Sequence, residues 1–225
     1  MTVLFVIFTI ILFLTVDYAV QKARTAKEEK RLLESLSQGL SAFPLRLPDG
    51  VDLAVNHTWL RAEPKGVATI GLDQFLGHMV GAVERIILPE VGAALTPASA
   101  RIVLCDGAKY LKLAAPVKGK VVAVNSSILK NPALARKDPY GAGWLLKIQP
   151  ANGRSGSTLL SGGKGIEWLK EQIDLAKEFL AARAPQVQYA TMQDGGIPVE
   201  GMLRNCDENT WRDFQEKFTR LHPNT

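Results

Sequence analysis

The pattern of apolar and polar positions changes along the chain and divides it into regions. Residues 3–16 form an apolar run without a charged side chain, whereas residues 43–150 hold short apolar runs separated by turn-forming residues. Beyond residue 165, apolar residues recur at the three- and four-residue spacing of amphipathic helices. The pattern predicts five parts: an anchor (residues 1–21), a helical stalk (22–42), a β domain (43–150), a Gly/Ser linker (151–165) and a helical extension (166–225).

The N-terminal run predicts a transmembrane helix. Extended to Val20 it reaches about 20 residues, the length that crosses a bilayer core. A cleaved signal peptide is the alternative, but no Lys or Arg precedes the run and small residues for cleavage are missing. Residues 21–31 then hold five basic and two acidic side chains. A positive flank stays in the cytoplasm, so we expect a single-pass membrane protein with its N-terminus outside and its remaining domains cytoplasmic.

Composition narrows the function classes. The chain of 225 residues is 47% hydrophobic and 22% charged, with a formal net charge of +5, as in ordinary folded proteins. His57, His78 and His222 lie far apart, and the two cysteines lack close spacing, so we expect no metal site. The basic residues lack the aromatic or motif support of a nucleic-acid interface, so no nucleic-acid partner is expected.

The central region predicts a mainly β domain with frequent turns. Two helical segments interrupt it: Asp73 to Ile86, and a helix that opens with Asn131-Pro132. We expect Gly119 to take a positive φ where two strands reverse. The strands are predicted in the runs VATIGL, RIVLC, YLKLAAPV, KVVAVN and WLLKIQP.

Large aromatic and turn residues complete the prediction for this domain. Trp59 and Trp144 are interpreted as core anchors rather than ligands. Asp138-Pro139-Tyr140-Gly141 has the composition of a tight turn. The predicted fold class is therefore α+β, mainly β, with a transmembrane helix before the β domain and helices after it.

Several ordered motifs of residues 45–150 resemble one known family. They are Asn56-His57-Thr58-Trp59-Leu60, Ala68 to Leu72, Leu88-Pro89-Glu90-Val91-Gly92, Ala115-Pro116-Val117-Lys118-Gly119, and Asp138 to Ile148. Together they are similar to the H protein of the glycine cleavage system, a relative of biotinyl and lipoyl carrier domains. The resemblance implies a barrel-sandwich hybrid fold.

In that family a lysine at a hairpin tip carries lipoate, in a sequence resembling Glu-Ser-Val-Lys-Ala. The matching residues here run from Cys105 to Lys109, and counting from either Gly92 or Pro116 places the lysine position on Ala108. An alanine cannot form the amide, so the resemblance implies a protein without lipoate at the family site and without a cofactor. The alternative is lipoate on Lys109, with Lys112 as a weaker candidate.

Cys105 stands where the family has its glutamate. A tip cysteine beside a lysine is a candidate reactive thiol, because a nearby cation favours the thiolate. The alternative interpretation is a small side chain without a reactive role. Pairing with Cys206 would require the C-terminal region to fold back onto the tip.

The C-terminal region predicts two helices, Ile166 to Ala182 and Asp207 to Leu221, with a short strand over residues 187–192 between them. The second helix carries an aromatic stripe of Trp211, Phe214 and Phe218, which indicates a packing surface. The Gly-Gly-Lys-Gly stretch before the first helix lacks the full spacing of a phosphate-binding loop and is interpreted as linker.

Three functions follow from these patterns. The first is a non-catalytic interaction subunit that holds protein subunits of a membrane-associated complex, of redox or electron-transport type, and contacts lipid through its anchor. The alternative is a lipoyl carrier that uses Lys109 to shuttle aminomethyl groups or reducing equivalents between enzymes. An enzyme is disfavoured: His78, Asp73 and Glu84 share a predicted helix, but no nucleophile–base set is evident.

Overall fold

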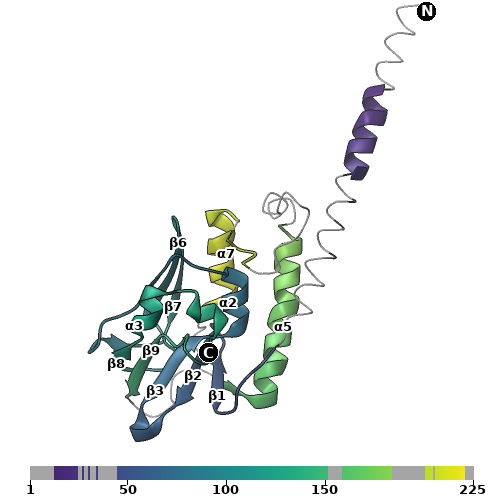
Figure 1. Cartoon of the computed structure of the whole chain (residues 1–225). Coiled ribbons are helices and arrows are strands. Elements are labelled where there is room, and N and C mark those ends of the chain that lie inside the picture. Colours follow the sequence, from purple (N-terminus) through teal and green to yellow (C-terminus); the bar gives the residue numbers. More distant parts are fainter. Residues whose placement is uncertain are drawn as a thin grey trace, which may run out of the picture.

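The structure, a computed structural model, describes residues 13–24, 27, 30, 34, 45–151, 159–183, 201–204 and 206–220. Two antiparallel sheets form its centre (Figure 1). The larger sheet has the order β10 (Leu159–Ser161), β1 (Val51–Ala54), β2 (Thr58–Ala62), β3 (Ala68–Leu72), β9 (Leu146–Pro150), β8 (Gly119–Val124) and β5 (Ala94–Leu95). The smaller sheet has the order β4 (Arg85–Ile87), β6 (Ala100–Asp106) and β7 (Lys109–Ala114).

Alternating side chains build the core of this β domain. On β6 and β7 every second residue is buried, including Ile102, Leu104, Leu111 and Leu113. Trp59 on β2 is fully buried and its indole nitrogen donates to the Pro139 carbonyl over 3.1 Å. The prediction of a mainly β domain is confirmed.

Helices cover two sides of the sheets. Short helices lie between the strands: η1 (Pro64–Gly66), α2 (Gln74–Val80), α3 (Ser126–Lys130) and α4 (Leu134–Lys137). Two longer helices follow: α5 (Gly162–Ala181), on the side of β1, and α7 (Glu208–Phe218), beside α2 and the β6–β7 hairpin (Figure 1). On α7 the predicted aromatic stripe is a packing surface, because Phe214 and Phe218 are buried against Phe179 of α5.

The predicted helix from Asp73 to Ile86 is shorter in the structure. It begins after Asp73, whose carboxylate accepts from the Leu76 N–H over 2.8 Å as an N-cap. It ends at Gly81, which has φ +75 and packs on the backbone of Gly201; a Cβ there would lie 2.6 Å from the Gly201 Cα. The residues around Ile86 form strand β4 instead.

Gly119 is required for a different reason from the one predicted. It does not belong to the glycines with positive φ, and it is the first residue of β8. A Cβ at this position would lie 2.6 Å from the Gln149 carbonyl oxygen on β9. The glycine therefore allows two paired strands to approach closely.

The prediction of a transmembrane helix is wrong for the part of the chain that the structure describes. Residues 13–24 are helical and hold Asp17, Lys22 and Arg24. No helix among the described residues is long and apolar enough to cross a membrane. The rest of the predicted anchor, residues 1–12, and most of the predicted stalk lie outside the described residues.

The predicted linker also differs from the structure. Its last part forms β10 and the first turn of α5, and β10 adds to the edge of β1, with Leu53 opposite Leu160. Residues 152–158 and the predicted strand at 187–192 lie outside the described residues. The two predicted C-terminal helices correspond to α5 and α7.

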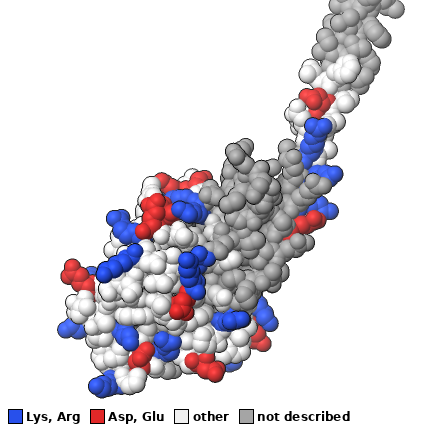
Figure 2. All heavy atoms as spheres, in the orientation of Figure 1, with Lys and Arg blue, Asp and Glu red and all other residues white. Residues whose placement is uncertain are grey.

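Charged side chains of both signs lie on the face of the molecule that Figure 2 shows. Figure 2 shows acidic and basic groups interspersed over the face in view, among uncharged residues. The formal net charge of +5 is therefore not gathered into a single basic field on this face. Interspersed charges favour solubility without imposing a long-range field of one sign.

Candidate functional site

The β6–β7 hairpin ends in a two-residue turn at the edge of the smaller sheet. Asp106 and Lys109 form the last cross-strand pair, and Gly107 and Ala108 make the turn between them. Gly107 has φ +60, as a glycine in the first central position of a type II′ turn does. Its N–H donates to a carboxylate oxygen of Glu84 over 3.1 Å. The tip is thus held by the residue that directly precedes the neighbouring strand β4.

The structure places Ala108 at the exposed tip and Lys109 one residue further, half-buried at the start of β7. The Lys109 ammonium donates to the backbone carbonyls of Arg204 and Cys206, the latter over 3.2 Å. It also lies 5.5 Å from the centre of the Trp211 ring. A cation over an indole face adds an attraction to these two hydrogen bonds. All these contacts come from the C-terminal region, about 95 residues away in sequence.

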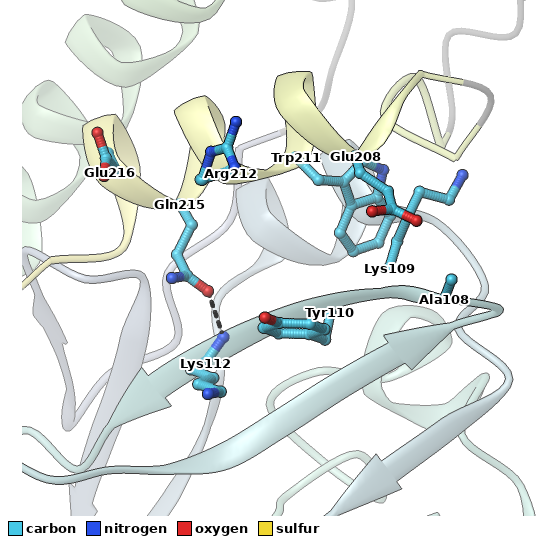
Figure 3. Close-up of a pocket in the computed structure, with 9 residues that line it drawn as sticks. All are labelled: Ala108, Lys109, Tyr110, Lys112, Glu208, Trp211, Arg212, Gln215 and Glu216. Carbon is cyan, nitrogen blue, oxygen red and sulfur yellow. Dashed lines mark hydrogen bonds between the residues drawn. The ribbon is translucent and has the colours of Figure 1, made fainter.

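A groove of about 280 Å³ separates β7 from α7 (Figure 3). At one point α7 also reaches the strand itself, where the Lys112 N–H donates to the Gln215 side-chain oxygen over 2.7 Å. This bond satisfies a backbone donor on an edge strand, which would otherwise be open to pairing. The groove is lined by Ala108, Lys109, Tyr110, Lys112, Glu208, Trp211, Arg212, Gln215 and Glu216.

Lys112 provides a contrast on the same strand. Its side chain is exposed, and its ammonium lies 5.1 Å from the centre of the Tyr110 ring. Figure 3 shows it on β7, away from the loop that receives Lys109. The two lysines therefore share a strand but differ in what surrounds the amine.

The two cysteines are both free thiols, although the C-terminal region folds back onto the hairpin. Cys105 is half-buried on β6, opposite Tyr110. Cys206 is buried, and burial raises the pKa of its thiol to about 11. A reactive role for Cys105 stays a prediction.

A buried His–Asp pair was missed by the sequence reasoning. Nδ1 of His57 lies 2.7 Å from a carboxylate oxygen of Asp73, and neither side chain is exposed. The His57 ring stacks on Phe75 at 4.5 Å and lies 4.7 Å from Trp168, centre to centre. The signal that could have revealed the pair is Asp73 itself, an N-cap residue placed directly before an apolar helix. The position of the pair, closed off by aromatic rings, makes it a part of the core.

Comparison with known proteins decides the family. Residues 52–172, more than half of the chain, match the sequence model described as glycine cleavage H-protein. The chain belongs to the glycine cleavage H-protein family. The resemblance expected from the motifs is thereby confirmed.

Individual relatives agree with this assignment. The glycine cleavage system H protein of Neisseria meningitidis serogroup A is 37% identical over 106 residues, which are 47% of this chain and 83% of the relative. The mitochondrial H protein of Flaveria trinervia is 32% identical over 55% of this chain and 74% of its own length. The crystal structure of the Mycobacterium marinum H protein superposes with a TM-score of 0.50 at 26% identity, covering 55% of this chain and 99% of that one.

Membership corrects the expectation of a protein without a cofactor. The H-protein family carries lipoate on a lysine, so the family points to a cofactor and not to its absence. At the hairpin tip Ala108 has no amine to form the amide. Lys109 has an amine and directly follows the two-residue turn of the same hairpin.

Proposed function

We propose that this H-protein family member is a lipoyl carrier that holds lipoate on Lys109 and shuttles aminomethyl groups or reducing equivalents between enzymes. The observation that carries the proposal is the position of Lys109, which directly follows the two-residue turn of the β6–β7 hairpin. A residue at this place lies at the end of the domain, where a long arm could reach a partner's active site once the amine leaves the Arg204 and Cys206 carbonyls. The family assignment supports the same role.

The chain's part in loading the arm is to supply the nucleophile. A neutral Lys109 amine would attack the acyl carbon of an activated lipoyl group, such as the mixed anhydride of an acyl adenylate. The C–N bond forms, the C–O bond to the phosphate breaks and its electron pair leaves with the adenylate, and the amine gives a proton to solvent. When bound, lipoate supplies a disulfide that accepts and releases electrons and carbon groups.

A carrier needs partners' active sites and no active site of its own. The described residues hold one pair that resembles catalytic machinery, His57 and Asp73, and both side chains are fully buried. The ion-pair and ring partners of His57 among the described residues are Asp73, Phe75, Trp168 and Phe218, and none of them carries a hydroxyl or thiol. This arrangement supports a carrier over an enzyme.

The experiment is the intact mass of the full chain after co-expression with a lipoate ligase in medium containing lipoate. We expect a mass increase of one lipoyl group, located on Lys109 by peptide mass spectrometry. Lys109→Arg should abolish the increase, whereas Lys112→Arg, which changes a lysine on the same strand, should retain it. A lipoyl group that persists in Lys109→Arg would contradict the assignment of the residue.

A positive control shows that the ligase accepts this hairpin. The double variant Ala108→Lys with Lys109→Arg places an amine at the family position and removes the neighbouring one. Ala108 is exposed in the turn, so the longer side chain can extend into solvent. If this variant is lipoylated while Lys109 remains unmodified in every background, the carrier proposal fails.

A further inference from the structure

The amine of Lys109 is bound by a segment outside the matched family region. Its two hydrogen-bond acceptors and its aromatic neighbour belong to residues 201–204 and 206–211, which we call the latch. The family model ends at residue 172. These contacts of the amine are therefore supplied by the C-terminal extension and not by the carrier domain.

The latch is fixed to the β domain at several points. The Gly201 N–H donates to the His78 carbonyl over 2.8 Å, and the Leu203 N–H donates to the Met79 carbonyl over 3.0 Å. These bonds use carbonyls of the last turn of α2, which otherwise lack helical partners. Arg204 adds an ion pair with Asp106 of the hairpin at 3.6 Å, although Arg204 is half-exposed and the pair is therefore weak.

The contacts of Lys109 oppose acylation. The nitrogen must present a lone pair to the acyl carbon, whereas here its protons point to the Arg204 and Cys206 carbonyls. Acylation would also remove the positive charge that interacts with the Trp211 ring and would leave one N–H where two bonds are made. A closed latch and an acylated Lys109 therefore exclude each other.

We propose that the latch gates Lys109: the lysine is acylated only when residues 201–204 and 206–211 move away from the hairpin tip, and acylation in turn keeps the latch open. That the gate controls the attachment of lipoate rests on the proposed function, whereas the protection of the Lys109 amine does not. Because the two states exclude each other, opening and acylation favour each other reciprocally. The gate confines loading of the arm to conditions under which the extension is displaced.

The test compares two lysines in one molecule. The full chain is treated with N-hydroxysuccinimidyl acetate, and the acetylation rates of Lys109 and Lys112 are measured by peptide mass spectrometry, each relative to the urea-denatured protein. We expect Lys109 to react about tenfold or more slowly than Lys112, since a hydrogen bond from a charged donor stabilises by roughly that factor. Equal acetylation rates of Lys109 and Lys112 in the native protein would contradict the proposal that the latch gates Lys109.

A variant that loosens the latch should remove the protection. Gly201 has φ +70, so Gly201→Ala strains the latch backbone, and we expect the Lys109 rate to rise about tenfold. Gly50→Ala is the matched control: Gly50 has φ +75 with open space around it, and it lies in the turn before β1. The Lys109 rate should not change there. Gln215→Ala, which removes the bond from α7 to β7, is a second and milder variant that should raise the rate in the same direction.

The same variants separate this inference from the carrier function. If acetate reaches Lys109 in Gly201→Ala but the lipoate ligase modifies neither this variant nor the native chain, the latch stands and the carrier proposal fails. If the ligase modifies Lys109 equally in both proteins while acetylation shows no protection, the carrier proposal stands and the latch fails.

Discussion

The β domain and the C-terminal extension bury their apolar side chains in different ways. In the β domain, two sheets enclose a core made mostly of aliphatic side chains from every second strand position. In the extension, α5 and α7 each bring one apolar stripe, and aromatic rings such as Phe179, Phe214 and Phe218 join the helices to each other and to α2. The buried side chains of both regions join in one hydrophobic cluster, and α7 reaches it through contacts such as Phe218 with Phe75 of α2.

This difference assigns separate tasks to the two regions at the hairpin. The sheet fixes the tip, through the Asp106–Lys109 pair and the bond from Gly107 to Glu84. The extension determines what surrounds the amine of Lys109, through Cys206 and Trp211. Position and accessibility of the lysine are therefore controlled by different parts of the chain, and substitutions should separate them.

The largest expected effect is a loss of folding stability in both regions, caused by truncating Trp59. Trp59 fills the space beside Gly71, where a Cβ would lie 2.5 Å from the indole ring, and it is fully buried. Trp59→Ala leaves a large cavity and an unpaired Pro139 carbonyl, so we expect a loss near the upper end of about 3–5 kcal/mol in the free energy of unfolding. Urea denaturation followed by circular dichroism measures it. Hydrogen exchange should show both regions losing protection, and an extension that stays protected would contradict its dependence on the sheets.

A smaller effect should release the extension alone. Phe214 stacks on Phe218 at 4.6 Å and meets Phe179 edge-on at 5.9 Å, centre to centre. Phe214→Ala should destabilise the docking of α7 by about 3 kcal/mol, because it truncates a fully buried aromatic ring. Amide exchange should accelerate in α7 and the latch while β2, β3 and β9 keep their protection.

Phe13→Ala is the matched control for that experiment. Phe13 is 76% exposed in the N-terminal helix, so its truncation removes a phenyl ring without opening a cavity. Its exchange pattern should equal that of the native chain. Loss of protection across the strands in Phe214→Ala would show instead that the two regions unfold as one unit.

The sequence predicted the parts of the fold that follow from local pattern. Short apolar runs between turn residues, RIVLC and YLKLAAPV, predicted β6 and β7, and helical spacing predicted α5 and α7. Prediction from the sequence failed where a contact between residues far apart in the chain determines the secondary structure. Strand β10 forms because it pairs with β1, and α2 stops at Gly81 because Gly201 packs against it.

The candidate site shows the same difference between features that follow from local pattern and features that depend on distant contacts. Counting between Gly92 and Pro116 located the tip turn and the neighbouring Lys109 without a structure. No local pattern indicates that Lys109 donates to residues 204 and 206, because that contact joins segments about 95 positions apart. The Gly/Ser-rich stretch before α5 suggested a linker, and the sequence left open whether the extension folds back onto the hairpin.

The smallest expected effect concerns the start of α7 and its dependence on pH. Asp207 caps the helix by accepting from the Thr210 N–H over 2.8 Å, and hydrogen bonds from the side chain and then the backbone of Thr210 hold the pKa of this carboxyl below its ordinary value. A lowered pKa stabilises the fold above the unfolded-state pKa, and that contribution is lost as pH falls through the folded-state value, so the cap should weaken below about pH 4.

Asp207→Ala should cost about 1 kcal/mol in the free energy of unfolding at neutral pH. Asp207→Asn keeps a capping oxygen, so it should retain most of the stability and lose the acid sensitivity, measured by amide exchange of the first turn of α7 between about pH 7 and about pH 3. Equal acid sensitivity in the native chain and in Asp207→Asn would assign the effect to another group. Because Asp207 directly follows Cys206, fraying of this turn should also loosen the carbonyl that holds Lys109.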